Sequence, residues 1–166
     1  MKTSDAITRI EAKSQPGKIG DMAAYHKIER RYIGTSNPDI DALCKEWRSQ
    51  IDLDQRLALA DGLWRSDIHE GRIAAAKLLT QARIRPNDSG AWDLICAWVP
   101  EFDAWAIADH VCIAAQKRIL ADPSRLETVA EWTRSPQMWA RRAALVSTLP
   151  FARMNNPKET DLAVRE

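Results

Sequence analysis

Apolar residues recur every three or four positions along most of this chain, which is the spacing of one face of an α-helix. The pattern is clearest after residue 103, where it places apolar residues at Ala104, Ile107, Ala108, Val111 and Ala115. Strand signals are weak, and the one hairpin dipeptide, Asp61-Gly62, falls inside a helical pattern. We therefore predict an all-α protein with helices over residues 4–14, 20–31, 38–50, 54–65, 69–83, 89–99, 103–120, 123–133 and 136–149.

Three tryptophans indicate an internal repeat, since Trp64, Trp98 and Trp132 follow one another at intervals of 34 residues. Each lies near the end of one predicted helix, before a short break and a second helix. The chain has seven tryptophans, so chance spacing is the alternative explanation. Helix pairs with such a period stack into a curved solenoid similar to HEAT repeats, and the stack offers a concave groove to an extended partner. We expect one such domain over residues 1–166.

The same period raises a question about the C-terminal end. The next landmark would fall at residue 166, so residues 150–166 would form the first helix of a pair without its second helix. Solenoids normally end in a capping repeat, and half a repeat caps poorly. The repeat therefore predicts a truncated chain that lacks the last helix pairs.

Prolines and one glycine mark the expected ends of several helices. Asn37-Pro38, Asp122-Pro123 and Ser135-Pro136 each place a side chain of a capping type directly before a proline, which suits the first helical turn. Gly34 precedes the first of these sites and is expected to serve a turn, because glycine tolerates positive φ.

The composition favours a folded protein that resides in a reducing compartment of the cell. The chain is 45% hydrophobic and 28% charged, and its three cysteines form an odd, widely spaced set. Neither a signal peptide nor a membrane-spanning stretch is evident, so we expect a soluble, cytoplasmic protein. Zinc spacings, phosphate loops and nucleophile elbows are not found either, and we expect no metal and no cofactor.

The net charge of +1 conceals an uneven distribution. Residues 85–115 hold one basic residue against five acidic ones, whereas residues 116–158 hold eight basic residues against three acidic ones. A region with a net charge of +5 is able to hold a phosphate backbone. An ordinary solvated surface explains the same charges equally well.

The predicted helix over residues 103–120 carries the best candidate for chemistry. Trp105 and Asp109 lie off its apolar stripe, and because they are four residues apart they share one face. An indole ring beside a carboxylate suits a cationic ligand, which both groups attract. The alternative is a structural tryptophan beside a solvated aspartate. His26, His69 and His110 show no ligand spacing, and we interpret His110 as a groove or surface residue.

Four segments carry a resemblance to a known family, in order along the chain: MAAYHKIERRYIGTSNPDIDAL, LWRSDIHEGRIAAAKLL, FDAWAIADHV and SPQMWARRAAL. The first resembles the family's opening aromatic, turn and proline-started helix, and the second its Ala-rich repeat. The third resembles its catalytic Trp-x-x-x-Asp helix, and the fourth its Trp-x-x-Arg-Ala-Ala helix. On these grounds the chain is similar to the AlkD-like DNA alkylation-repair glycosylases from about residue 20 onward.

The resemblance implies a role for each matching residue. Asp109 would be the catalytic carboxylate, and Trp105 would pack on the deoxyribose of the lesion. Tyr25 matches an aromatic residue of the DNA groove, and Arg142 matches a residue that grips the DNA backbone. Arg141 and Trp139 of the same helix complete the expected DNA-binding set. A further groove tryptophan of the family lies on a later helix, before which this chain ends.

The implied activity is that of a hydrolase in base excision: a monomeric glycosylase that releases N3- or N7-alkylated purines from duplex DNA without flipping the base. Alkylation makes the purine cationic and hence a good leaving group, so one carboxylate suffices where glycosidases usually use two. The alternatives are a non-catalytic DNA-binding scaffold and a HEAT-like protein–protein adaptor.

Overall fold

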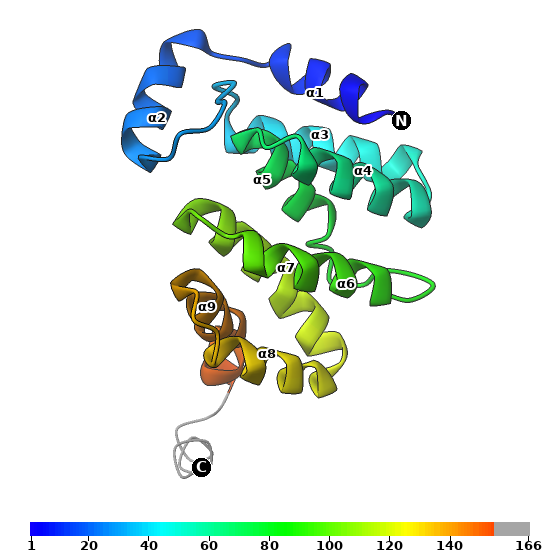
Figure 1. Cartoon of the computed structure of the whole chain (residues 1–166). Coiled ribbons are helices and arrows are strands. Elements are labelled where there is room, and N and C mark those ends of the chain that lie inside the picture. The colour runs from blue at the N-terminus through cyan, green and yellow to red at the C-terminus, as the bar shows by residue number, and fades with distance from the viewer. Residues whose placement is uncertain (155–166) are drawn as a thin grey trace.

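The computed structural model describes residues 1–154, which form nine α-helices and contain no β-strand. Figure 1 shows successive helices stacked along one direction, from the N-terminal α1 to α9. The α-helices are α1 (Thr3–Glu11), α2 (Ile19–His26), α3 (Asn37–Gln50), α4 (Leu53–Arg65), α5 (His69–Leu78), α6 (Ser89–Trp98), α7 (Trp105–Ala121), α8 (Leu126–Thr133) and α9 (Met138–Met154). Short 3-10 helices are η1 (Pro16–Lys18), η2 (Val99–Glu101) and η3 (Pro123–Arg125). The predicted all-α class is confirmed.

Consecutive helices pack as pairs, and each pair packs on the next. α4 contacts α5, α6 contacts α7 and α8 contacts α9, while α3, α5, α7 and α9 contact one another in series. The repeat tryptophans lie where neighbouring pairs meet. The Trp64 and Trp98 rings stack with their centroids 4.6 Å apart and their planes 7° apart, and both are buried. The third landmark, Trp132, instead stacks on Trp92, with their centroids 5.7 Å apart, so only the first two equivalent tryptophans pack against each other.

Three helices end at least three residues earlier than predicted, and the first of them, α1, stops at Glu11 rather than residue 14. α2 stops at His26 because Lys27 adopts the left-handed conformation, with φ of 56°. α5 stops at Leu78 rather than residue 83. The fully buried Arg118 guanidinium donates to the carbonyl oxygens of Gln81 and Ala82, which draws that segment out of the helical path.

The C-terminal expectation was partly wrong. A helix ending at residue 149 and a new one starting at Pro150 were predicted, but α9 continues through Pro150 to Met154. The predicted unpartnered helix over residues 150–166 therefore does not start where expected. Its remainder, residues 155–166, lies outside the described residues.

Of the three expected caps, only Asp122 occupies the expected position, at the start of η3, whereas Ser135 and Pro136 lie before α9, which begins at Met138. Asp122 accepts a hydrogen bond from the Ser124 amide, and the Ser135 hydroxyl accepts one from the Gln137 amide. For α3 the capping side chain is Ser36, whose hydroxyl accepts from the amide of Asp39, and not the expected Asn37.

The turn at Gly34 is confirmed, because its φ is 87°. A Cβ there would lie 2.7 Å from the carbonyl oxygen of Gln15, so no larger residue fits without moving the backbone.

Candidate functional site

Trp105 and Asp109 lie on the exposed face of α7, because the opposite face of this helix packs in the core. All five positions of its predicted apolar stripe, from Ala104 to Ala115, are buried. Trp105 is the first residue of the helix, and 40% of its surface remains exposed. Asp109 follows one turn later and is partly exposed. The sequence-based placement of both residues off the core face is thus confirmed.

The Asp109 carboxylate is held by Arg142 of α9. Nε of Arg142 donates to Oδ1 at 3.1 Å, and its terminal nitrogen donates to Oδ2 at 2.9 Å. Such a two-bond fork fixes the plane of a carboxylate as well as its position. The hydrogen bond to Asp109 raises the pKa of Arg142 above its ordinary value. Two lone-pair positions of the carboxylate stay available to other donors.

The other residues expected on the DNA-binding face occupy different environments. Arg141 is exposed, and its guanidinium donates to the carbonyl oxygens of Ser135 and Pro136 in the turn before α9. Trp139 is partly buried and packs against the hydrophobic core. DNA contacts by these residues, and by Arg142, stay predictions.

Tyr25 lies beside Trp105 although eighty positions separate them in the sequence. The edge of one ring meets the face of the other, with centroids 5.7 Å apart and planes at 82°, and Tyr25 is 67% exposed. This is a favourable geometry for two aromatic rings. α2 and the N-terminus of α7 thus form one exposed aromatic surface from two distant segments.

The structure also brings together three histidines, which the sequence had not marked as a site. The rings of His26 and His69 lie 4.3 Å apart, and His26 also packs against Trp105 at 5.6 Å. With His110 they line a pocket of about 330 Å³ whose wall includes Tyr25 and Trp105. We name this the aromatic pocket. Its histidines come from α2, α5 and α7, so no local spacing in the sequence could have revealed them.

Burial keeps the histidines of the aromatic pocket uncharged at neutral pH. Desolvation, with a smaller contribution from His26, lowers the pKa of His69 to about 3. Burial likewise lowers the pKa of His26 and that of His110 from their ordinary value. His26 and His69 therefore each have one N–H donor and one bare nitrogen acceptor, whereas the N–H of His110 already donates from Nδ1 to the carbonyl oxygen of Ala106 at 2.7 Å.

The segment that carries Tyr25 is anchored by a buried carboxylate. Glu70 of α5 is fully buried and accepts hydrogen bonds from the amides of Ile33 and Gly34, the latter at 2.7 Å. These bonds fix the loop between α2 and α3, which contributes Gly34 and Thr35 to the wall of the aromatic pocket. Glu70 therefore shapes the pocket without lining it.

A second anchor joins this loop to the N-terminus of α7. The buried side chain of Arg30 forms ion pairs with Asp67 at 2.8 Å and with Asp103 at 2.5 Å. Asp103 lies two residues before Trp105. Arg30 therefore fixes the position of the segment that carries Tyr25 relative to the N-terminus of α7, where Trp105 lies.

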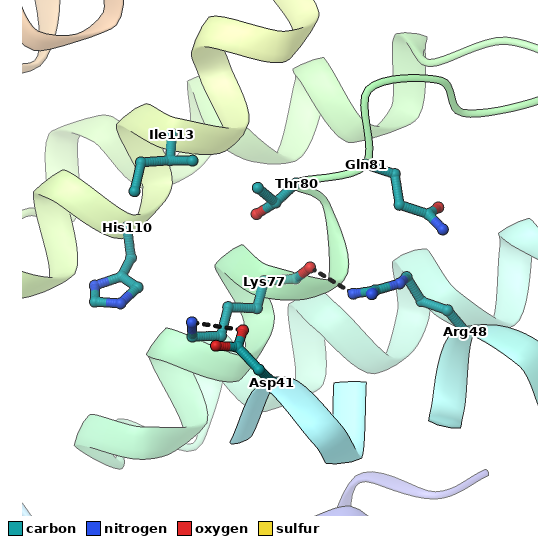
Figure 2. Close-up of a pocket in the computed structure, with 7 residues that line it drawn as sticks. All are labelled: Asp41, Arg48, Lys77, Thr80, Gln81, His110 and Ile113. Atoms are coloured by element: carbon teal, nitrogen blue, oxygen red, sulfur yellow. Dashed lines mark hydrogen bonds and ion pairs between the residues drawn. The ribbon is translucent and has the colours of Figure 1, made fainter. Parts of the chain in front are cut away.

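A second pocket of about 230 Å³ adjoins the first and shares His110 with it. Figure 2 shows His110 and Ile113 on α7, across from Lys77 and Asp41. The Lys77 ammonium lies 2.7 Å from Asp41, and Arg48 donates to the Lys77 carbonyl oxygen at 3.0 Å. We name this the charged pocket, since two cations and one carboxylate line it.

The basic C-terminal region is less available than its net charge suggests. Arg118 and Arg125 both form ion pairs with Asp88, and neither side chain is more than 10% exposed. These two residues stabilise the contact between α7, η3 and the loop before α6. The excess of positive charge in the sequence therefore overstates the surface that a phosphate backbone would meet.

Other reactive groups are unsuited to catalysis in the described part of the chain. The three cysteines are free, and burial raises the pKa of Cys44 and Cys112 to about 12 and that of Cys96 to about 11. No cluster of three metal-ligating side chains occurs in residues 1–154. None of the helices in this range combines the length and apolar character that a bilayer crossing requires.

The fold and the site define the class as an all-helical protein of paired helices, with an aromatic and carboxylate-bearing face assembled from separate pairs. The chain belongs to the DNA alkylation repair enzyme family, whose model matches residues 6–165. The resemblance drawn from the sequence is thereby confirmed. No curated protein and no solved structure shows significant similarity to the chain.

Proposed function

We propose that this protein is a DNA glycosylase that hydrolyses the N-glycosidic bond of N3- or N7-alkylated purines in duplex DNA. The observation that carries the proposal is the Asp109 carboxylate, fixed by Arg142 one helical turn from the exposed Trp105 ring. Membership of a DNA alkylation repair family supports DNA as the substrate. In this proposal the stacked pairs form a HEAT-like solenoid, and the duplex lies along its inner face.

The chemistry asks little of the protein because the damaged base is already cationic. As the bond between C1′ and the base breaks, its electron pair moves to the base and positive charge develops on the sugar. Asp109 stabilises that charge by Coulomb attraction, and the face of Trp105 attracts it through the ring quadrupole. Water then attacks C1′ and loses a proton to the surrounding solvent, which leaves a hydroxyl group on the sugar. Contacts to the sugar and backbone suffice for these steps, so the base need not be flipped before cleavage.

The decisive measurement is base release from a duplex that contains 7-methylguanine. Asp109→Asn keeps the size of the side chain and removes its charge, so we expect excision to slow by about 10²–10³-fold. Asp93→Asn on the exposed face of α6 is the matched control and should leave the rate unchanged. An Asp109→Asn variant that excises at the wild-type rate would contradict the proposal.

One observation favours a second candidate, a DNA-binding scaffold without catalysis. Asp109 is already neutralised by Arg142, which weakens its ability to stabilise another cation. This candidate predicts salt-sensitive duplex binding with no base release. A HEAT-like adaptor, by contrast, would have no affinity for DNA even at low salt.

A further inference from the structure

We infer that the aromatic pocket binds a single uncharged alkylated purine base, the leaving group of the proposed reaction. The inference rests on the proposed function and adds to it a site for the released base. It is argued from the size of the pocket, its aromatic walls, two buried imidazole nitrogens and a lining with a single charged residue.

The dimensions and walls suit one planar ring system. Pockets for small molecules typically enclose about 300–1,000 Å³, and at about 330 Å³ this one lies at the lower limit. A base fits that space better than a nucleotide with its sugar and phosphate. Trp105, Tyr25 and His26 supply aromatic surface from two helices, and bases stack on aromatic side chains irrespective of their identity.

Two polar atoms of the lining are left without partners. Nδ1 of His69 and Nδ1 of His26 are buried and have no hydrogen-bond partner among the described residues. His69 itself is only 1% exposed. Unsatisfied polar groups at such depth are rare in folded proteins, so both rings keep an unused hydrogen-bonding atom beside the cavity. The edge of a purine carries ring acceptors beside exocyclic donors or carbonyls, which match neutral imidazoles.

The low charge of the pocket favours the neutral released base over the charged phosphates of the DNA backbone. Among the described lining residues Lys18 is the only one that is charged at neutral pH, because burial lowers the pKa of each histidine. When the glycosidic bond breaks, its electrons cancel the positive charge of the alkylated base. The leaving group is therefore neutral, as is every lining residue of the pocket except Lys18. Trp105 lines the pocket and lies on the same face as Asp109, so the released base has a short path into it.

The test is a titration of the full chain with free 3-methyladenine and 7-methylguanine, without DNA, followed by tryptophan fluorescence and by ¹⁵N shifts of the histidine rings. We expect saturable binding that moves the imidazole nitrogens of His69. Adenosine and inorganic phosphate serve as comparison probes and should bind much more weakly. His69→Phe keeps a ring and removes the nitrogen, and should weaken base binding about three- to tenfold. Lys45→Ala on the exposed face of α3, outside both pockets, should leave it within about twofold.

The outcomes separate this inference from the proposed function. Absence of base binding in the wild-type chain, or histidine shifts that do not respond to a bound base, would overturn the inference whether or not His69→Phe folds. Phosphate binding as tight as base binding would do the same. Base excision without measurable affinity for the free base would leave the glycosylase proposal standing alone. Base binding by a chain that excises nothing would instead overturn the glycosylase proposal and leave the base site intact.

Discussion

The aromatic pocket and the charged pocket share His110 but differ in almost everything else. Rings and neutral imidazoles line the first, whereas Arg48, Lys77 and Asp41 line the second. The first depends on the α2 segment, which is held by Glu70 and Arg30. The second is formed by α3, α5 and α7 together with Thr80 and Gln81 of the loop that follows α5.

This difference indicates that the two pockets suit different parts of one ligand. A neutral aromatic site suits bases and sugars, and a site with a net positive charge suits the phosphate backbone. Nucleic acid presents both chemistries within a few ångströms. The predictions that follow are arranged to disturb one pocket while leaving the other in place.

The largest effect is expected from the anchor of the aromatic pocket. Glu70→Ala leaves the amides of Ile33 and Gly34 buried without an acceptor, which should lower the free energy of unfolding by about 2–5 kcal/mol. Urea unfolding measures the change. Glu70→Gln keeps an acceptor oxygen and should lose less. Glu127→Ala on an exposed face of α8 is the control, and a Glu70→Ala loss no larger than that of the control would show that the loop is held by other contacts.

A loss of stability of intermediate size is expected when the pH is lowered. The folded-state pKa of His69 is about 3, below the ordinary value of 6.5, so the unfolded chain takes up the proton first as the pH falls. The contribution of His69 to stability is complete above pH 6.5 and declines from there to pH 3. Lowering the pH from 7 to 5 should therefore reduce the free energy of unfolding by about 2 kcal/mol through His69.

The measurement compares urea unfolding of the wild type at the two pH values with that of His69→Phe, which cannot titrate at this position. The variant should show a shallower dependence on pH. Equal slopes for the two proteins would mean that His69 is protonated in the folded state.

The smallest effect is expected in the charged pocket. Asp41→Asn releases Lys77 from its ion pair, which should tighten duplex binding about two- to fivefold at low salt. Lys77→Gln should reduce the slope of log affinity against log salt by about one. Fluorescence anisotropy with a labelled duplex measures both, and Asp54→Asn on α4 is the control. If Asp41→Asn weakens binding, DNA does not lie over this pocket.

Sequence patterns predicted the features of the molecule that depend on local periodicity. The stripe of α7 placed Trp105 and Asp109 off the core face, and the 34-residue interval predicted helix pairs, of which α4 with α5, α6 with α7 and α8 with α9 are found. The repeat alone did not distinguish Trp105 from its counterpart Gly71. That glycine is required because a Cβ would lie 2.8 Å from the Ser66 hydroxyl, whereas Trp105 points outward.

The parts that were missed depend on contacts between distant residues. The Asp109–Arg142 pair spans 33 positions, and the end of α5 is set by Arg118, nearly forty residues further on. The three histidines share a pocket only because the α2 segment folds back onto α5 and α7. Such long-range contacts leave no periodic trace in a single sequence.

The ion pair between Arg30 and Asp103 has a consequence for synthesis on the ribosome. Proteins emerge from their N-termini, so α2 and Tyr25 are made long before the helix that bears Trp105. Until Asp103 has left the exit tunnel, the guanidinium of Arg30 lacks one of its two carboxylate partners. The face that we propose for DNA is therefore completed only after more than half of the chain has been translated, and a prematurely terminated chain would lack it.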